Sequence, residues 1–350
     1  MNYARKHLSS IQGYVPGEQP REDGFIKLNT NENPYPPSPR VFEAIQQVTG
    51  ESLRKYPDPV FRRLREKIGK TYRVKPDQIF VGNGSDEVLS LLVRTFVDVN
   101  EKVVFTYPTY VLYETLASLN AVHHEAIELD EQFNLPDEVF QCVGKLFFLP
   151  NPNSPTGKPV KKEIICRLCR SFSGLVVADE AYADFGDNSS IPLLKECPNL
   201  IILRTFSKSF SLASIRVGFA IAQEELIADL MKTKDSYNVN LLSQLAAEAA
   251  IDDINHMREN VRRVVSTREH LSENLQKLGF TVYPSGANFV LARFSSGNVG
   301  FIYEELKKRK ILVRYFPIRR LEDCLRITVG TGEEVDALLK ELADITQKHI

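Results

Sequence analysis

Lys208 lies in a hydroxyl-rich segment directly after Ser207, and Arg216 follows eight residues later. Upstream, Asp179 directly follows the apolar run 175–178. A lysine amine can form an imine with an aldehyde, and a carboxylate can pair with a protonated ring nitrogen. Hydroxyl groups and a guanidinium can hold a phosphate. Together these residue types predict a site for pyridoxal phosphate.

Each of these residues has a plainer interpretation when it is taken alone. Most lysines lie on the surface, and a carboxylate after a strand often caps a helix. However, an acid that follows four apolar residues faces desolvation and is rarely left without a partner. Paired with a pyridinium, Asp179 would keep the ring nitrogen protonated through a charge-assisted hydrogen bond worth about 2 kcal/mol. The hydroxyl neighbours and Arg216 likewise favour a functional Lys208.

A second candidate phosphate site is the glycine-rich turn 82–86. It contains Gly84, Ser85 and Asp86. The turn follows a predicted strand and opens the predicted helix 87–96, so backbone N–H groups and the helix dipole would face a phosphate. An ordinary tight turn has the same composition. The turn gains significance only with the hydroxyls and the guanidinium around the lysine, which would meet the same phosphate.

Two further loops begin at predicted strand ends. Tyr110 follows the strand 103–105, where it could stack on a flat ring or pack within its own loop. The segment 151–157 is rich in Asn, Pro and Gly, which is typical of a turn. An asparagine in that turn could also donate a hydrogen bond to a phenolate oxygen on the cofactor ring.

Arg314 and Arg326 lie in or beside predicted strands near the C-terminus. An arginine within an otherwise apolar strand needs an anionic partner, because unpaired burial of a charge is expensive. That partner is either a glutamate of the chain or the carboxylate or phosphate of a substrate.

Six short apolar segments without polar alternation predict the strands of one sheet. They span 79–81, 103–105, 146–149, 175–178, 200–203 and 217–221. Strands that are apolar on both faces are typical of a mostly parallel sheet covered by helices, which gives a three-layer α/β/α domain. Ligands of such sheets bind beyond the carboxyl ends of the strands, where Asp179 is expected.

A smaller α/β unit is predicted after a long helical stretch at about 241–278. Its strands are expected at 289–292, 311–314 and 325–329, and its helices at 300–310 and 333–348. The proline-rich segment 14–39 predicts an extended arm that joins this unit. The predicted organisation is an arm with part of the small domain at 1–45, a large domain at 46–275 and a small domain at 276–350.

The chain of 350 residues carries 44 basic and 45 acidic side chains. This balance gives no indication of a nucleic-acid or membrane-surface partner. The N-terminal residues lack the apolar core of a signal peptide and no segment is apolar over about 18 residues, so a cytoplasmic location is expected.

The five cysteines, including Cys166 and Cys169, form no ligand or disulfide pattern. We therefore expect reduced thiols and no metal.

Nine segments in a fixed order carry a resemblance to a known family. They are 28–34, 82–87, 107–110, 155–157, 178–182, 207–208, 216–219, 237–240 and 325–330. With them the chain resembles the class II, fold-type-I aminotransferases, and most closely the histidinol-phosphate aminotransferase family, over nearly its whole length. The resemblance implies the pyridoxal-phosphate-dependent transferase fold and that cofactor. It also implies ping-pong transamination of L-histidinol phosphate with 2-oxoglutarate, which gives imidazole acetol phosphate and L-glutamate.

The resemblance further implies a role for each candidate residue. Lys208 would form the internal aldimine and shuttle a proton to and from the substrate carbon. Asp179 would pair with the ring nitrogen, Tyr182 with the phenolate oxygen, and Tyr110 would stack on the ring. The residues implied around the phosphate are Gly84, Ser85, Asp86, Thr205, Ser207 and Arg216.

Four further positions follow from the resemblance. Tyr56 is implied to reach the phosphate site of a partner subunit, which makes a homodimer, and Tyr14 to close over the substrate. Many relatives place asparagine directly before Pro-Thr-Gly, whereas here Ser154 takes that place and Asn153 precedes it. Either residue could face the phenolate oxygen and the substrate. Asn153 is favoured because its amide can donate in a fixed geometry.

Substrate choice depends on the two arginines. Arg326 matches the arginine that holds an α-carboxylate in most relatives, so the phosphate of histidinol phosphate would take that place, joined by Arg314. Aromatic amino-acid aminotransferases keep a similar arginine, and lyases such as threonine-phosphate decarboxylase resemble this family closely. Both activities are therefore alternatives.

Overall fold

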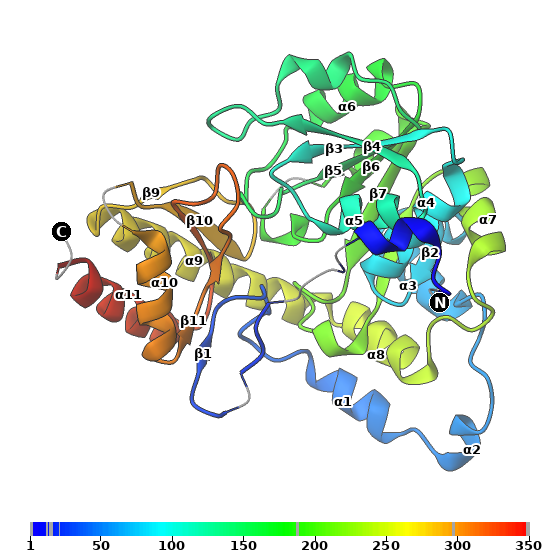
Figure 1. The fold of residues 1–350 in the computed structure, drawn as a ribbon. Coiled ribbons are helices and arrows are strands. Elements are labelled where there is room, and N and C mark those ends of the chain that lie inside the picture. The colour runs from blue at the N-terminus through cyan, green and yellow to red at the C-terminus, as the bar shows by residue number, and fades with distance from the viewer. Residues whose placement is uncertain are drawn as a thin grey trace.

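The computed structural model describes residues 3–11, 13, 17–20, 22–186, 189–295 and 298–347. Its largest element is a seven-stranded sheet with the order β2-β8-β7-β6-β5-β3-β4 (Figure 1). The strands are β2 (Ile79–Gly82), β3 (Lys102–Tyr107), β4 (His123–Glu128), β5 (Leu146–Pro150), β6 (Leu175–Asp179), β7 (Leu200–Thr205) and β8 (Gly218–Ile221). Strand β8 is antiparallel to both of its neighbours, and all other pairs are parallel. The predicted mostly parallel sheet is confirmed.

Alternate residues of these strands pack on opposite faces of the sheet. In β6, Val176 and Ala178 join one apolar cluster, whereas Val177 joins the other. One face is covered by α4 (Ser85–Phe96), α5 (Leu112–Leu119) and α7 (Glu224–Thr233). The other is covered by α1 (Pro39–Gln46), α3 (Arg62–Tyr72), α6 (Lys162–Ser171) and α8 (Leu241–Asp252). The three-layer α/β/α architecture is therefore confirmed, with apolar strands buried on both sides.

A smaller unit follows in the sequence. Its sheet is antiparallel with the order β12-β13-β10-β9. The elements are α9 (Ile254–Lys277), β9 (Thr281–Val282), β10 (Phe289–Arg293), α10 (Val299–Lys308), β11 (Ile311–Leu312), β12 (Arg314–Tyr315), β13 (Cys324–Thr328) and α11 (Gly332–Gln347). Strand β1 (Ile26–Lys27) pairs in parallel with β11, so the N-terminal arm lies against this unit as expected (Figure 1).

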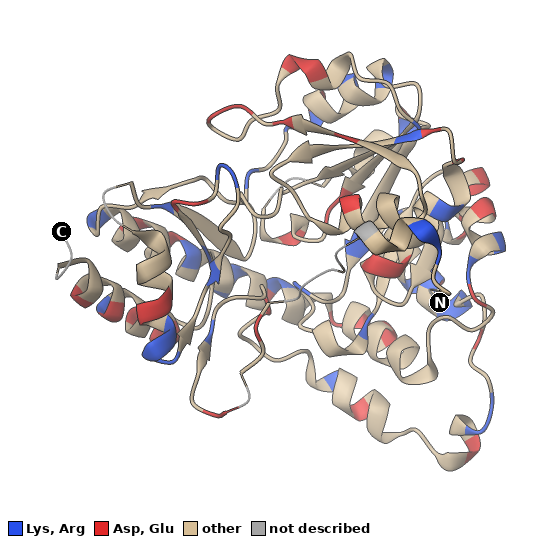
Figure 2. Cartoon of the chain, viewed as in Figure 1, with Lys and Arg blue, Asp and Glu red and all other residues tan. Residues whose placement is uncertain are grey.

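Short helices make up the remaining elements. They are α2 (Gly50–Leu53) and the 3-10 helices η1 (Lys6–Ser10), η2 (Pro76–Gln78), η3 (Asp137–Phe140), η4 (Ala183–Phe185), η5 (Ile191–Lys195) and η6 (Ala213–Ile215). Within the described ranges, no helix combines the length and the apolar character that crossing a membrane requires. Basic and acidic residues are interspersed over both units (Figure 2). The domain boundaries stay a prediction.

Two predicted elements differ in the structure. The long helix expected at 241–278 is broken, because Asp253 has a non-helical backbone and accepts a hydrogen bond from Ser38 Oγ at 2.6 Å. The strand expected at 311–314 is divided between two partners. Its first half pairs with the arm and Arg314 pairs with β13, so Val313 marks a change of sheet.

Candidate active site

Asp179 is the last residue of β6, near the middle of the sheet, and only 6% of it is exposed. Its Oδ2 accepts a hydrogen bond from the Tyr113 hydroxyl at 2.7 Å, and its Oδ1 accepts one from the Ala181 backbone N–H at 3.2 Å. Burial raises the pKa of Asp179 to about 6, although both hydrogen bonds oppose the rise. The carboxyl group is therefore held rigidly at the carboxyl end of a central strand.

Tyr113 was not among the residues predicted for the site. It lies in the first turn of α5 and is fully buried, with its ring stacked on Phe148 at a centroid distance of 4.8 Å. The edge of Tyr110 meets the same ring at 5.7 Å. Burial, together with the neighbouring Asp179 carboxylate, raises the pKa of Tyr113 well above 10, so its hydroxyl keeps its proton.

Lys208 follows β7 and faces the N-terminal arm. Its Nζ donates to the backbone oxygens of Thr30 at 3.3 Å and Asn31 at 3.2 Å. The same nitrogen lies 5.5 Å from the centroid of the Tyr182 ring. The structure thus brings Lys208 and Tyr182 together, as expected, and adds the arm as a third element.

Asn31 connects the arm to both units. Its backbone is left-handed, with φ at 58°, and its Nδ2 donates to the Tyr182 hydroxyl at 3.0 Å. Its backbone N–H donates to Thr328 Oγ1 at 3.0 Å, and its backbone oxygen accepts from Asn288 Nδ2 at 3.0 Å. Residue 31 belongs to a segment that carries the family resemblance, but its pairing with Tyr182 was not predicted.

The two segments predicted for phosphate binding meet in space. Arg216 Nη2 lies 3.2 Å from Asp86 Oδ2, and Arg216 Nη1 donates to Ser207 Oγ at 3.4 Å. Tyr110 donates to the other Asp86 oxygen at 3.4 Å. Gly84 has a φ of +80°, and a Cβ there would lie 2.5 Å from Arg216 Nη2, so a larger residue would displace the guanidinium.

The base of this region is formed by the segment that contains the lysine. Thr205 is buried, and its Oγ1 accepts a hydrogen bond from the Ser207 backbone N–H at 3.1 Å. Ser85 is the first residue of α4, where backbone N–H groups and the helix dipole favour an anion. The residues predicted around a phosphate therefore lie in two loops that Arg216 joins.

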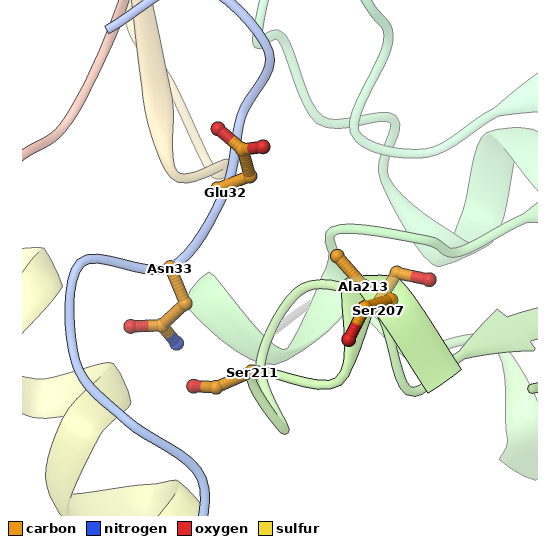
Figure 3. A pocket seen from close by; sticks show the side chains of 6 residues that line it. Glu32, Asn33, Ser207, Ser211 and Ala213 are labelled. Atoms are coloured by element: carbon orange, nitrogen blue, oxygen red, sulfur yellow. The ribbon is translucent and has the colours of Figure 1, made fainter. Parts of the chain in front are cut away.

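A cavity of about 420 Å³ opens beside Ser207. It is lined by Glu32, Asn33, Ser207, Ser211, Ala213 and Ser214. Figure 3 shows Glu32 and Asn33 on the arm, opposite the loop that follows Lys208. Asn33 Nδ2 also donates to the backbone oxygen of Lys208 at 3.1 Å, so the arm forms one wall of the site.

These residues fit pyridoxal phosphate by their chemistry. No ion pair among the residues that the structure describes involves Asp179, although its carboxyl group is buried. A buried carboxylate without a cation of the protein suits a cationic ring nitrogen. Lys208 supplies the amine, Tyr182 a phenol, and the loops around Arg216 supply donors for a phosphate.

The two arginines of the small unit meet at one aromatic ring. The Arg326 Cζ lies 5.4 Å from the Phe316 ring centroid, and the Arg314 Cζ lies 5.2 Å from it. Arg326 donates to Ser154 Oγ at 3.2 Å and to the backbone oxygen of Asn29 at 2.9 Å. These contacts hold the Arg326 guanidinium between the small unit, the arm and the 151–157 loop.

Asn153 ties two loops of the large unit together. Its Nδ2 donates to the backbone oxygen of Pro108 at 3.1 Å and to Thr156 Oγ1 at 2.9 Å, while its Oδ1 accepts from Thr109 Oγ1 at 3.3 Å. Ser154 is buried and contacts Arg326 instead. Both hydrogens of the Asn153 amide thus have acceptors within the chain.

Tyr56 and Tyr14 are the two remaining predicted residues. Tyr56 is 78% exposed, and its ring stacks on Tyr237 at a centroid distance of 4.3 Å. The geometry of one chain therefore leaves Tyr56 available to another molecule. Tyr14 lies outside the described residues.

Comparison with known proteins identifies the family. A family model described as aminotransferase class I and II matches residues 23–342. The chain belongs to this family. A histidinol-phosphate aminotransferase from Syntrophotalea carbinolica is 45% identical over 346 residues, which cover 99% of this chain and 100% of that protein. Histidinol-phosphate aminotransferase 1 from Trichormus variabilis is 43% identical, with 98% and 99% covered.

Solved structures confirm the fold-type-I aminotransferase architecture. Histidinol-phosphate aminotransferase from Sinorhizobium meliloti, in complex with pyridoxal-5'-phosphate, superposes with a TM-score of 0.89 at 22% identity, covering 99% of this chain and 98% of that one. An aspartate aminotransferase variant from Thermus thermophilus reaches 0.83 at 20% identity, with 99% and 100% covered. The predicted family and fold are thus confirmed, whereas likeness at these identities does not distinguish substrates.

Proposed function

We propose that this aminotransferase catalyses reversible, pyridoxal-phosphate-dependent transfer of the amino group of L-histidinol phosphate to 2-oxoglutarate. The products would be imidazole acetol phosphate and L-glutamate, as in histidine biosynthesis. The observation that carries this proposal is identity of up to 45% to histidinol-phosphate aminotransferases over essentially the whole of both chains. The geometry of the site supports the same chemistry.

Lys208 is proposed to anchor the cofactor and to move the proton. When bound, pyridoxal phosphate supplies a ring that withdraws electrons from the substrate carbon. The arm carbonyls of Thr30 and Asn31 and the ring of Tyr182 hold the Lys208 Nζ in place. With cofactor and substrate bound, this nitrogen would serve as general base and then as general acid at the substrate carbon.

Asp179 and Tyr182 are proposed to hold the two polar edges of the ring. The buried Asp179 carboxylate pairs with the ring nitrogen and keeps it protonated. The Tyr182 hydroxyl already accepts from Asn31, so its own proton is directed to the phenolate oxygen. Tyr110 is proposed to stack on the ring. Asn153 is proposed to face the phenolate oxygen, to which it would donate in place of its present contact with Pro108 or Thr156.

The phosphate is proposed to bind between the two loops that Arg216 joins. Arg216 supplies charge, Ser207 and Thr205 supply hydroxyls, and the first turn of α4 supplies backbone N–H groups. Asp86 lies 3.2 Å from Arg216, and this contact fixes the direction of the guanidinium. The full proposed set is Gly84, Ser85, Asp86, Thr205, Ser207 and Arg216.

The substrate phosphate is proposed to bind at Arg326 and Arg314. Both guanidinium groups approach the Phe316 ring, so they lie on one side of the site. A dianionic phosphate can pair with two arginines, whereas a single carboxylate needs only one. Tyr14 is proposed to close over the bound substrate.

The rival activities are distinguished by substrate and by acceptor. We expect kcat/KM for L-histidinol phosphate to exceed that for L-phenylalanine by at least about 100-fold, because only the former carries a phosphate for two arginines. A preference for phenylalanine would instead indicate an aromatic amino-acid aminotransferase. Turnover that releases carbon dioxide and needs no 2-oxoglutarate would indicate a lyase such as threonine-phosphate decarboxylase.

A homodimer is also proposed, with Tyr56 reaching the phosphate site of the partner subunit. The exposure of the stacked Tyr56 and Tyr237 rings supports this contact. Sedimentation should then give about twice the 39.7 kDa of one chain. A cytoplasmic location is proposed as well, and the small-molecule substrates support it.

A further inference from the structure

The hydrogen bond between Tyr113 and Asp179 joins a buried phenol to the carboxylate at the centre of the site. The two oxygens lie 2.7 Å apart, within the range of a strong charge-assisted bond. Tyr113 is fully buried, and its ring is fixed by Phe148 at an interplanar angle of 10°. The hydroxyl therefore has a fixed direction, and the acceptor it contacts within the described part of the chain is Asp179.

We propose that Tyr113 is a positioning residue that holds the Asp179 carboxylate in its charged form and so keeps the proton on the cofactor's ring nitrogen. This inference rests on the proposed function, in which Asp179 pairs with that nitrogen. Tyr113 contacts the carboxylate, and in the proposed complex it would meet Asp179 rather than a reacting atom. It acts only through Asp179.

The direction of the effect follows from which form the hydrogen bond favours. A donor to a carboxylate stabilises the ionised form and lowers its affinity for a proton. Among the described residues, the charged groups with the largest effect on Asp179 are Asp86 on α4 and Glu180 beside it, and both raise its proton affinity. Tyr113 is the side-chain donor that opposes them, because the remaining donor is the Ala181 backbone N–H.

Loss of the Tyr113 hydroxyl should therefore move the proton toward Asp179 and leave the ring nitrogen less charged. A ring with less positive charge withdraws electron density less strongly. The Lys208 nitrogen that is bonded to the cofactor should therefore lose its proton at a higher pH. A hydrogen bond to a charged group corresponds to about a 10- to 100-fold effect on the equilibrium or rate that depends on it.

The test is Tyr113→Phe, with Tyr283→Phe as the matched control. Tyr283 is also buried, but it packs against Phe133 in a separate apolar cluster. The pH midpoint of the visible absorbance of the bound cofactor should rise by about one unit or more in Tyr113→Phe. The kcat should fall about 10- to 100-fold with little change in KM, because the lost effect belongs to the transition state. Tyr283→Phe should change neither quantity.

A double-mutant cycle with Asp179→Asn separates electrostatic coupling from structural damage. In the Asp179→Asn background, Tyr113→Phe should change kcat less than twofold. The reason is that residue 179 then has no carboxylate for the Tyr113 hydroxyl to stabilise in its charged form. An equal effect in both backgrounds, an unchanged midpoint in Tyr113→Phe, or a Tyr113→Phe protein that does not fold would each overturn the inference. Failure of the wild-type protein to bind pyridoxal phosphate would instead overturn the proposed function.

Discussion

Asp179 places a carboxyl group where its charged form is poorly solvated. Burial raises its pKa to about 6, from an ordinary value of 3.8. The folded chain thus binds this proton more tightly than the unfolded chain does. The stability of the cofactor-free protein should therefore fall as pH rises from about 4 to 6 and stay lower above that range. In the proposed holoenzyme, a cationic ring nitrogen offsets this cost.

Asp179→Asn should accordingly stabilise the protein once the cofactor has been removed by dialysis. We expect a gain in unfolding free energy of up to about 3 kcal/mol at pH 7.5, because the amide carries no charge to desolvate. Urea unfolding from pH 4 to pH 8 measures the gain, which should disappear near pH 4. A gain that does not change with pH, or a loss at pH 7.5, would contradict this account. The same variant should lose transaminase activity.

The loop that leads into α4 shows how a backbone conformation shapes the site. Gly84 precedes Ser85, the first residue of the helix, with a left-handed φ of +80°. Only glycine adopts this conformation without strain and also leaves space for Arg216. The loop therefore presents both the helix N-terminus and the guanidinium on one side.

Gly84→Ala should weaken cofactor binding more than it weakens the fold. We expect the dissociation constant of pyridoxal phosphate to rise at least about tenfold, because the new Cβ displaces the Arg216 guanidinium. Fluorescence titration of the cofactor-free protein measures this constant. Gly50→Ala is the control, since nothing lies within 4 Å of its added Cβ. Equal affinities in the two variants would argue against a phosphate site at this loop.

A cluster of ion pairs links strand β7 to the segment that follows β6. Arg204 on β7 is 3% exposed, and it contacts Glu180 at 2.9 Å and also Asp184. Asp184 accepts a further hydrogen bond from Ser209 Oγ at 2.5 Å. Because these residues neighbour Asp179, Tyr182 and Lys208 in sequence, the cluster fixes three backbone segments of the site.

Arg204→Met should lower the unfolding free energy by about 3–5 kcal/mol, because it leaves the buried Glu180 and the partly buried Asp184 without a cation. Urea unfolding measures the change. Arg54→Met removes an exposed arginine that pairs with Glu51 three residues earlier, and it should leave the urea midpoint unchanged. A loss below about 1 kcal/mol in Arg204→Met would show that the cluster contributes little.

The sequence predicts those elements whose signal is local. The central strands follow from apolar runs, and Asp179 follows from its place at a strand end. Lys208 follows from its hydroxyl neighbours and from Arg216. Strand β4 was not predicted, because it lies at the sheet edge and its side chains are mostly exposed and polar. The break at Asp253 depends on Ser38, a contact across 215 positions that no local pattern indicates.

Contacts between distant parts of the sequence also explain why Tyr113 and Asn31 were not predicted as site residues. Tyr113 reaches Asp179 only because α5 packs on the face of the sheet beside β6. Asn31 reaches Tyr182 because the arm folds back onto the small unit, where Asn31 contacts Thr328 across 297 positions. Both positions are ordinary polar residues until the tertiary structure brings them to the site.

In the whole molecule, the residues proposed to bind the cofactor and those proposed to bind the substrate phosphate belong to different units. The large unit supplies the lysine, the carboxylate and the phosphate loops, whereas the small unit supplies Arg314 and Arg326. The arm joins the units, because β1 pairs with β11 while Thr30 and Asn31 contact Lys208. Substrate binding and cofactor binding should therefore be separable by mutation.

Arg326→Ala should raise KM for L-histidinol phosphate by at least about tenfold while it leaves cofactor affinity within about twofold. The reason is that Arg326 contacts the arm and Ser154 rather than the phosphate loops. Steady-state kinetics and cofactor titration measure the two effects. An equal loss of both affinities would point to a structural role. Arg293→Ala, an arginine of β10 paired with Asp323, is the control for loss of a small-unit arginine.

The most direct measurement is borohydride reduction of the cofactor-loaded protein, followed by mass analysis of its peptides. The proposed anchor predicts that the cofactor becomes fixed to the peptide that contains Lys208, and that Lys208→Ala shows no such adduct. An adduct on a different lysine of the wild-type protein, or an undiminished adduct in Lys208→Ala, would contradict the assignment of Lys208 as the residue that holds pyridoxal phosphate.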